Sequence, residues 1–280
     1  FGRMQVKGRV ATEEKRARLE AQFAIRTAED VAQVLGGMKG AIMKAGQMLS
    51  FIADGLPPEA QAALATLQAD VPPMAPSLAE QVIRQELGKD PEHLFLEWDP
   101  VPVAAASIGQ VHRGRLHDGR EVAIKVQYPG IAEAVHADLR NLRLGLKLLA
   151  TIAPGIDTVA IADEIRERIS EELDYELEAA THQEMARIYK GHPFIVVPGV
   201  VGSMCRERVL VSEYLDAVRF AAARESLSQA QRDRAGEIIV RFYINGPLRH
   251  RLLNGDPHPG NCLFLPDGRV GFVDFGFAKR

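Results

Sequence analysis

Four polar residues in three separated segments could together support phosphoryl transfer from a magnesium-bound nucleotide. Lys125 ends the apolar run VAIK, Asp256 and Asn261 flank the turn DPHPGN, and Asp274 opens DFG. In this chemistry one carboxylate orients or deprotonates the acceptor, an amide and a second carboxylate hold the metal, and a lysine holds the phosphates. A solvated strand lysine or a Pro/Gly-rich turn explains each segment alone, but not their ordered combination. We therefore predict catalytic roles for Lys125 and Asp256, and metal binding by Asn261 and Asp274.

A phosphate-binding loop is expected just before the lysine strand. Such loops in kinases read G-x-G-x-x-G-x-V, and Gly109 with Val111 fits the final G-x-V. The first two glycine positions then fall on alanines. Alanine disfavours the positive φ that glycine allows, by about 1–2 kcal/mol, so we expect a loop with more helical character and a serine hydroxyl near the phosphates. The residues predicted to contact nucleotide here are Ala104, Ala105, Ala106, Ser107 and Gly109.

Lys125 also needs an anionic partner to hold it on the phosphates. We predict a helix from about residue 161 to 189, on which Asp174 and Glu178 share a face because they lie four positions apart. Glu172 lies off that face, and spacing alone does not decide among these three acids. The alanines after Glu178 suit a helix face that packs against other structure.

The segment VLVSEYL is expected to end a strand beside the adenine ring. The backbone carbonyl and N–H groups of Glu213 and Leu215 would read the adenine edge there. An ordinary strand end is the alternative interpretation.

Hydrophobic periodicity and turn residues predict the elements that position these groups. The first hundred residues are predicted to be helical, including SLAEQVIRQELG after the linker VPPMAP. Two hairpins are expected, with turns at His117-Asp118-Gly119 and Pro266-Asp267-Gly268. A last helix is predicted from about Ser228 to Asn245.

Composition excludes several other classes of protein. The chain has 34 Lys and Arg against 37 Asp and Glu, so it lacks the basic excess that nucleic-acid binding requires. Cys205 and Cys262 lie far apart without a CxxC pair, and we expect two buried thiols in a reducing compartment. No apolar run reaches the length of about 18 residues typical of a membrane span, and the N-terminus lacks a secretory signal.

These motifs resemble those of the UbiB/AarF family of atypical kinase-like proteins, over nearly the whole chain. The shared motifs are KAGQ at 44–47, AAAS at 104–107, VAIK, ELDY at 172–175, DPHPGN and DFG. The resemblance implies an α+β, protein-kinase-like bilobal fold with an N-terminal all-helical extension and a truncated C-terminal lobe. Residues 1–97 would form the extension that carries KxGQ. Residues 98–215 would form the N-terminal lobe with a helical insertion, and residues 216–280 the start of the C-terminal lobe.

The resemblance also implies roles for individual residues. Lys44 and Gln47 would fold over the active site and meet Glu172 and Asp174 of the E-x-D motif, with a catalytic and regulatory role for Lys44. Glu178 would pair with the lysine of VAIK. The alanine loop is associated in this family with altered nucleotide preference and restrained kinase activity.

The implied cofactors are ATP or ADP with Mg²⁺ or Mn²⁺, and the implied activity is ATP hydrolysis more readily than protein phosphorylation. The resemblance links the chain to ubiquinone and other isoprenoid-lipid metabolism. Adenine nucleotide, isoprenoid lipid, an anionic membrane surface and lipid-biosynthesis proteins are the partners implied, and nucleic acid is not. We accordingly expect a cytoplasmic protein that is peripheral to a membrane or anchored to it.

Two features depart from the family pattern. Asn254 and Gly255 stand where kinases carry His-Arg before the catalytic aspartate, so a His-mediated contact to the DFG segment is not expected. The chain begins at Phe1 without Met and stops at Arg280, soon after DFG. We therefore expect a fragment that lacks most of the C-terminal lobe and any membrane-spanning segments near the end of a longer protein.

Two other functions are compatible with parts of the sequence. A small-molecule phosphotransferase of the aminoglycoside or choline kinase type shares GDPHPGN, but lacks the K-x-G-Q helix and the alanine loop. A catalytically weak, nucleotide-sensing scaffold that binds lipid is the other alternative. The apolar segment GAIMKAGQMLSFI and the basic excess of residues 1–26 would suit a membrane surface, although a solvated helix face explains these charges equally well.

Overall fold

The computed structural model describes residues 73–106, 108–137, 139, 163, 166–167 and 170–280. The chain divides into two compact units, one formed by residues 1–72 and 130–169 and the other by residues 73–129 and 170–280. All the described residues of the predicted site belong to the second unit. Lys44, Gln47 and Ser107, together with most of the expected helical extension, lie outside the described residues. The division at residues 97 and 215 stays a prediction.

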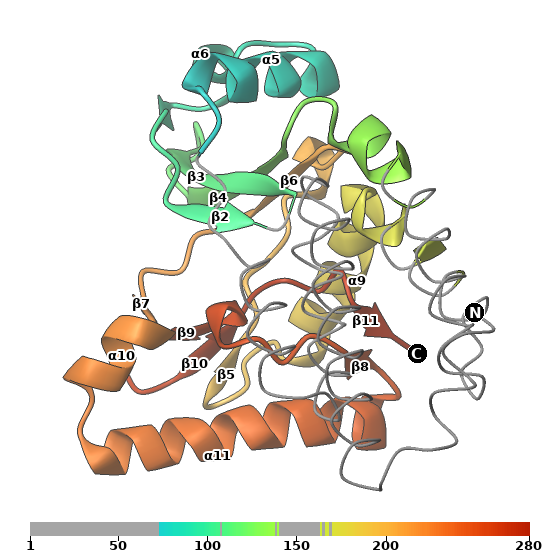
Figure 1. Cartoon of the computed structure of the whole chain (residues 1–280). Helices are drawn as coiled ribbons and strands as arrows, with labels where there is room; N and C mark the ends of the chain where they lie inside the picture. The colour runs from blue at the N-terminus through green and yellow to red at the C-terminus, as the bar shows by residue number, and fades with distance from the viewer. Residues whose placement is uncertain (1–72, 107, 138, 140–162, 164–165, 168–169) are drawn as a thin grey trace, which may run out of the picture. The chain divides into compact units, whose positions relative to one another are not determined.

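Five antiparallel strands form the first sheet of the second unit (Figure 1). β3 (Gly109–Arg115) pairs with β4 (Glu121–Gln127), and β4 pairs with β6 (Val209–Glu213). Two short strands, β1 (Glu97–Trp98) and β2 (Ala104–Ala106), pair with opposite ends of β3. The predicted β3–β4 hairpin is confirmed, and Gly119 adopts the positive φ of 90° that its turn requires.

One face of this sheet is covered by α5 (Pro76–Leu87), which is followed by the short helix α6 (Pro91–Leu94). Val122, Ile124 and Val126 of β4 are fully buried in the core that the sheet forms with α5. Because side chains alternate along a strand, Lys125 lies on the opposite face of β4. The alternation of VAIK thus separates the core from the candidate site.

A second sheet contains the catalytic-loop and DFG segments. Its strands run in the order β5 (Ile195–Val196), β10 (Val270–Phe272), β9 (Cys262–Phe264) and β7 (Val218–Arg219), with β5 parallel to β10. The predicted hairpin at Gly268 joins β9 to β10 and is confirmed. A separate pair is formed by β8 (Leu253–Asn254) and β11 (Ala278–Lys279).

Helices pack around the second sheet, and short helical turns lie between other elements of the chain. The longer helices are α9 (Tyr175–Ile188), α10 (Phe220–Ser226) and α11 (Gln229–Asn245), and the short turns are η3 (Gly202–Met204), η4 (Gly246–His250) and η5 (Pro259–Asn261). The helix predicted from about Ser228 to Asn245 is confirmed as α11, and Ser228 caps it in a reciprocal arrangement with Gln231. Phe242 of α11 stacks on Phe272 of β10 with ring centroids 3.8 Å apart, which fixes α11 against the strand before DFG.

The prediction of one continuous helix from residue 161 to 189 is wrong. Residues 170–172 are helical, the helix stops at Leu173, and α9 begins at Tyr175 with Asp174 as its N-cap. Oδ1 of Asp174 accepts hydrogen bonds from the backbone N–H groups of Glu176 at 2.9 Å and Leu177 at 3.4 Å. A carboxylate at this position satisfies N–H groups that a helix start leaves unpaired, so the local cap overrides the helical periodicity.

The prediction that the alanine loop has helical character is also wrong. Ala104, Ala105 and Ala106 form β2, and extended backbone requires no positive φ. Gly109 is needed for another reason, since a Cβ on it would lie 2.2 Å from the carbonyl oxygen of Val126. The alanines thus form a strand that pairs with β3, and Gly109 allows β3 to approach β4 closely.

Two further expectations concern thiols and membrane spans. Cys205 and Cys262 are buried free thiols, as predicted. Within the part of the chain that the structure describes, no helix is both long and apolar enough to cross a bilayer.

Candidate active site

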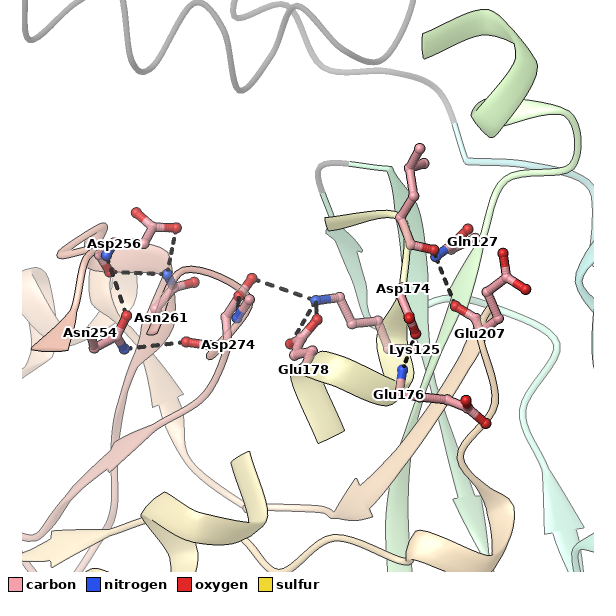
Figure 2. A network of polar contacts seen from close by, with 12 residues as sticks. Lys125, Gln127, Asp174, Glu176, Glu178, Glu207, Asn254, Asp256, Asn261 and Asp274 are labelled. Carbon is pink, nitrogen blue, oxygen red and sulfur yellow. Dashed lines mark hydrogen bonds and ion pairs between the residues drawn. The ribbon is translucent and has the colours of Figure 1, made fainter. Parts of the chain in front are cut away.

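Lys125 lies between two carboxylates that come from distant parts of the sequence (Figure 2). Its Nζ donates to both carboxylate oxygens of Glu178, at 2.9 and 2.7 Å, and lies 3.6 Å from Oδ2 of Asp274. Burial acts to lower the pKa of Lys125, but the carboxylates of Asp274 and Glu178 outweigh it, and the pKa is raised well above its usual value. Lys125 is therefore a fixed positive charge, and Glu178 is its partner among the three acids considered. This is the pairing that the family resemblance implied.

Asp256 and Asn261 contact each other across the DPHPGN turn (Figure 2). Nδ2 of Asn261 donates to Oδ2 of Asp256 at 3.1 Å and to its carbonyl oxygen at 3.4 Å. The hydroxyl of Tyr243 in α11 donates to the same carbonyl at 3.0 Å. Nδ1 of His258 accepts from the backbone N–H of Gly260 at 3.1 Å and so shapes the turn. Since Asn261 donates through its nitrogen, its Oδ1 is the atom that could ligate a cation.

Asp274 has a backbone conformation that is unusual for a residue other than glycine. Its φ is 72°, in the left-handed region, which costs on the order of 1–3 kcal/mol. Oδ1 of Asp274 accepts from the backbone N–H of Gly276 at 3.3 Å. The preceding residue, Val273, donates to the carbonyl of Asn261 at 3.1 Å, which holds the two predicted metal ligands on adjacent backbone segments.

Asn254 joins the catalytic loop to the DFG segment. Its Nδ2 donates to the carbonyl oxygen of Asp274 at 3.3 Å, and its Oδ1 accepts from the backbone N–H of Asp256 at 3.3 Å. The side chain is buried, so both bonds are shielded from water. No contact to the DFG segment was expected here, because Asn254 and Gly255 replace His-Arg. Asn254 nevertheless makes such a contact.

The strand end predicted to contact adenine joins the first sheet to β7 of the second. The backbone N–H of Glu213 donates to the carbonyl of Gly199 at 2.8 Å, and its carboxylate accepts from the N–H of Gly199 at 2.9 Å. Leu215 packs beside β10, where a Cβ added to Gly271 would lie 2.7 Å from its Cδ1. The side chains of Glu213 and Leu215 thus have structural contacts, and the adenine-reading role of their backbone stays a prediction.

The E-x-D residues lie just before the site helix. Glu172 is buried, and Asp174 caps α9. Their expected contacts with Lys44 and Gln47 fall outside the described residues.

Two aromatic residues at the site were missed by sequence reasoning. Nζ of Lys125 lies 4.8 Å from the centroid of the Tyr175 ring, and the ring of His182 lies 4.7 Å from that of Phe275 in DFG. The spacing of four from Glu178 could have placed His182 on the site face of α9. No local pattern indicates that Tyr175 faces the lysine.

The oxygen donors suit a magnesium ion that is shared with phosphates. Among the described residues, no three His, Cys, Asp or Glu side chains converge as a metal-binding group. Asn261 and Asp274 offer one amide oxygen and one carboxylate, and proteins usually hold Mg²⁺ through one or two carboxylates together with phosphate oxygens and water. The donor set therefore fits Mg²⁺, or Mn²⁺ as a similar hard cation.

Comparison of the sequence with known families and proteins identifies similar proteins. The profile of the ABC1 atypical kinase-like domain matches residues 66–280. Protein ACTIVITY OF BC1 COMPLEX KINASE 1, chloroplastic, from Arabidopsis thaliana is 36% identical over 255 residues, which cover 89% of this chain and 37% of that protein. Atypical kinase COQ8B, mitochondrial, from Rattus norvegicus is 34% identical over 254 residues, which cover 90% of this chain and 48% of that protein. The chain thus spans less than half the length of these curated relatives.

A solved structure shows the same fold. The complex of Rv3197 with erythromycin, from Mycobacterium tuberculosis, superposes with a TM-score of 0.68 at 37% identity, over 94% of this chain and 67% of that one.

Proposed function

Because this chain belongs to the ABC1 atypical kinase-like family, we propose that it binds ATP or ADP with Mg²⁺ or Mn²⁺ and acts as an ATPase or phosphotransferase. The observation that carries the proposal is the convergence of Lys125, Glu178 and Asp274, which brings one ammonium and two carboxylates within 3.6 Å. Removing such charges from water is costly, so a functional reason for keeping them together is expected. Binding phosphate and a divalent cation is such a reason.

Each side chain has a defined task in this proposal. Lys125, held by Glu178, would bind the phosphates. Asn261 and Asp274 would hold the cation, which when bound would offset the negative charge of the phosphates. Asp256 would orient a water or an acceptor hydroxyl and take its proton, a contribution typically worth about 10² to 10⁴ in rate.

The remaining predicted residues would complete the nucleotide site. The backbone of Ala104, Ala105, Ala106 and Gly109 would lie along the phosphates, with the Ser107 hydroxyl beside them. The backbone of Glu213 and Leu215 would read adenine. Lys44 and Gln47, with Glu172 and Asp174, would lie over the place where a protein substrate would bind, as the resemblance implies.

We further propose that this activity supports ubiquinone or related isoprenoid-lipid metabolism. The resemblance to the UbiB/AarF family supports this role, with isoprenoid lipid or an anionic membrane surface and lipid-biosynthesis proteins as partners. The two buried free thiols support a reducing compartment such as the cytoplasm, and the resemblance supports a location peripheral to or anchored at a membrane.

Transfer to a small-molecule acceptor is a second candidate function. The related Rv3197 structure is described as a complex with erythromycin, and the DPHPGN loop is compatible with a small hydroxylated acceptor. Phosphate transfer from ATP to erythromycin, measured beside ATP hydrolysis, separates the two functions.

The test of the main proposal is magnesium-dependent release of phosphate from ATP. Lys125→Ala and Asp274→Asn should each abolish turnover, whereas the exposed-site controls Lys89→Ala and Asp233→Asn should retain it. Equal turnover in all five proteins would refute the assignment of this site.

A further inference from the structure

Gln127 lies where β4 meets the start of α9 and joins the two elements. It follows Lys125 by two positions, so both side chains lie on the same face of the strand. Nε2 of Gln127 donates to the carbonyl oxygen of Leu173 at 2.8 Å. It also donates to the carbonyl oxygen of Glu207 at 3.1 Å (Figure 2). The side chain is only 1% exposed, so these two bonds form in the interior. Strand β4 therefore holds the residues that come just before α9.

The first turn of α9 is held by several bonds that share these anchors. The backbone N–H of Tyr175 donates at 2.9 Å to the same Glu207 carbonyl that Gln127 uses. The next two N–H groups are capped by Asp174. Glu178 follows Tyr175 by three residues and lies one turn into the helix. The position of its carboxylate thus depends on how this first turn is fixed.

The ring of Tyr175 forms a wall beside Lys125. Tyr175 is fully buried, and its ring centroid lies 4.8 Å from Nζ of Lys125. The aromatic face attracts the ammonium group and keeps water from the ion pair. The Tyr175 hydroxyl has no hydrogen-bond partner among the described residues, so the ring rather than the hydroxyl carries the contact with the lysine.

We propose that Gln127 and Tyr175 are positioning residues that assemble the Lys125–Glu178 pair before nucleotide binds. The inference rests on the proposed function, because it assumes that Lys125 contacts phosphate. If the first turn of α9 were released, Glu178 would move away and Asp274, 3.6 Å away, would remain as the carboxylate nearest Lys125. Lys125 would then neutralise a carboxylate that is assigned to the cation. Loss of either positioning residue should therefore raise the magnesium concentration needed for binding, which general destabilisation does not do.

The test titrates a fluorescent ATP analogue and MgCl₂ against the full chain and five variants. Gln127→Met removes both donated bonds at similar volume, and Tyr175→Met removes the aromatic face. Each should weaken nucleotide binding on the order of tenfold and raise the midpoint of the magnesium titration. Tyr175→Phe, which keeps the ring, should bind within about twofold of wild type.

Two further variants separate positioning from stability and from the proposed function. Val82→Ala, in the buried face of α5, should lower the stability but leave nucleotide and magnesium affinity unchanged. If wild type and Lys125→Ala bind the analogue equally, the proposed function and this inference are both overturned. If Lys125→Ala loses binding while Gln127→Met and Tyr175→Met match wild type, only the positioning role is overturned. Circular dichroism identifies variants that do not fold. If Tyr175→Met does not fold, the result for Gln127→Met decides whether the positioning role is correct.

Discussion

Lowering the pH from 7 to 5 should destabilise this protein through the buried side chain of His182. His182 lies in α9, is 2% exposed and contacts the ring of Phe275. Neither ring nitrogen makes a hydrogen bond of good geometry within the described residues, although the Pro198 carbonyl lies near enough to act on the ring. Burial, aided by the charge of Lys125, lowers the pKa of His182 from 6.5 to about 4, whereas Asp274 and the carbonyl of Pro198 act in the opposite direction.

The sign and size of the effect follow from these two pKa values. Between pH 6.5 and about 4 the unfolded chain binds a proton at His182 that the folded protein does not, so the free energy of unfolding falls as the pH falls. The full effect is about 3 kcal/mol, at about 1.4 kcal/mol for each tenfold change in proton affinity. About 2 kcal/mol of this is lost by pH 5.

Urea unfolding of wild type and His182→Leu at pH 7 and pH 5 measures the effect. Leucine has a similar volume and does not titrate, so the variant should lose about 2 kcal/mol less than wild type over this range. The exposed variant His117→Gln is the control and should keep the wild-type difference. Equal losses in wild type and His182→Leu would refute the reasoning, because contributions from other groups, including the buried His112, are common to both.

Three other perturbations follow from the geometry. Lys125→Met should lower the free energy of unfolding in urea by about 3–5 kcal/mol, because it leaves the buried Glu178 carboxylate without its cation. Adding Glu178→Leu should restore most of this stability, and a double variant as unstable as Lys125→Met would contradict the reasoning. Gly109→Ala should lower the free energy of unfolding by about 1–3 kcal/mol, because its Cβ would lie 2.2 Å from the Val126 carbonyl oxygen, whereas Gly236→Ala, at an open position of α11, should raise it slightly. Similar melting temperatures for these two variants would contradict the packing argument. In calorimetry, Asn254→Leu should weaken magnesium affinity about 10- to 100-fold but leave metal-free nucleotide binding unchanged, because it removes the hydrogen bond from Asn254 to the Asp274 carbonyl. Unchanged magnesium affinity would show that magnesium binding does not depend on this hydrogen bond.

The strands and turns of this fold were predictable because their rules are local. Asp-Gly and Pro-Asp-Gly turns fixed both hairpins, and the alternation in VAIK placed Lys125 opposite the core. Ser228 marked the start of α11 for the same reason, since its cap involves a residue three positions away. The order of VAIK, DPHPGN and DFG was then enough to predict a shared site.

The remaining features depend on contacts between distant residues. The helix break at Asp174 lies in a sequence with strong helical periodicity, and the anchors around it come from Gln127 and the Glu207 carbonyl. Spacing left three acids as partners of Lys125, and only the hydrogen bonds formed in the folded protein select Glu178. Alanines suggested a helical loop, but pairing with β3 makes them a strand.

The central claim, a magnesium–nucleotide site at Lys125, Asn261 and Asp274, is tested most directly by calorimetric titration of ATP with and without Mg²⁺. The wild-type chain should bind ATP more tightly when Mg²⁺ is present, and Asp274→Asn should bind with nearly the same affinity in both conditions. If wild type shows no magnesium dependence, or if Asp274→Asn keeps all of it, the site is assigned wrongly.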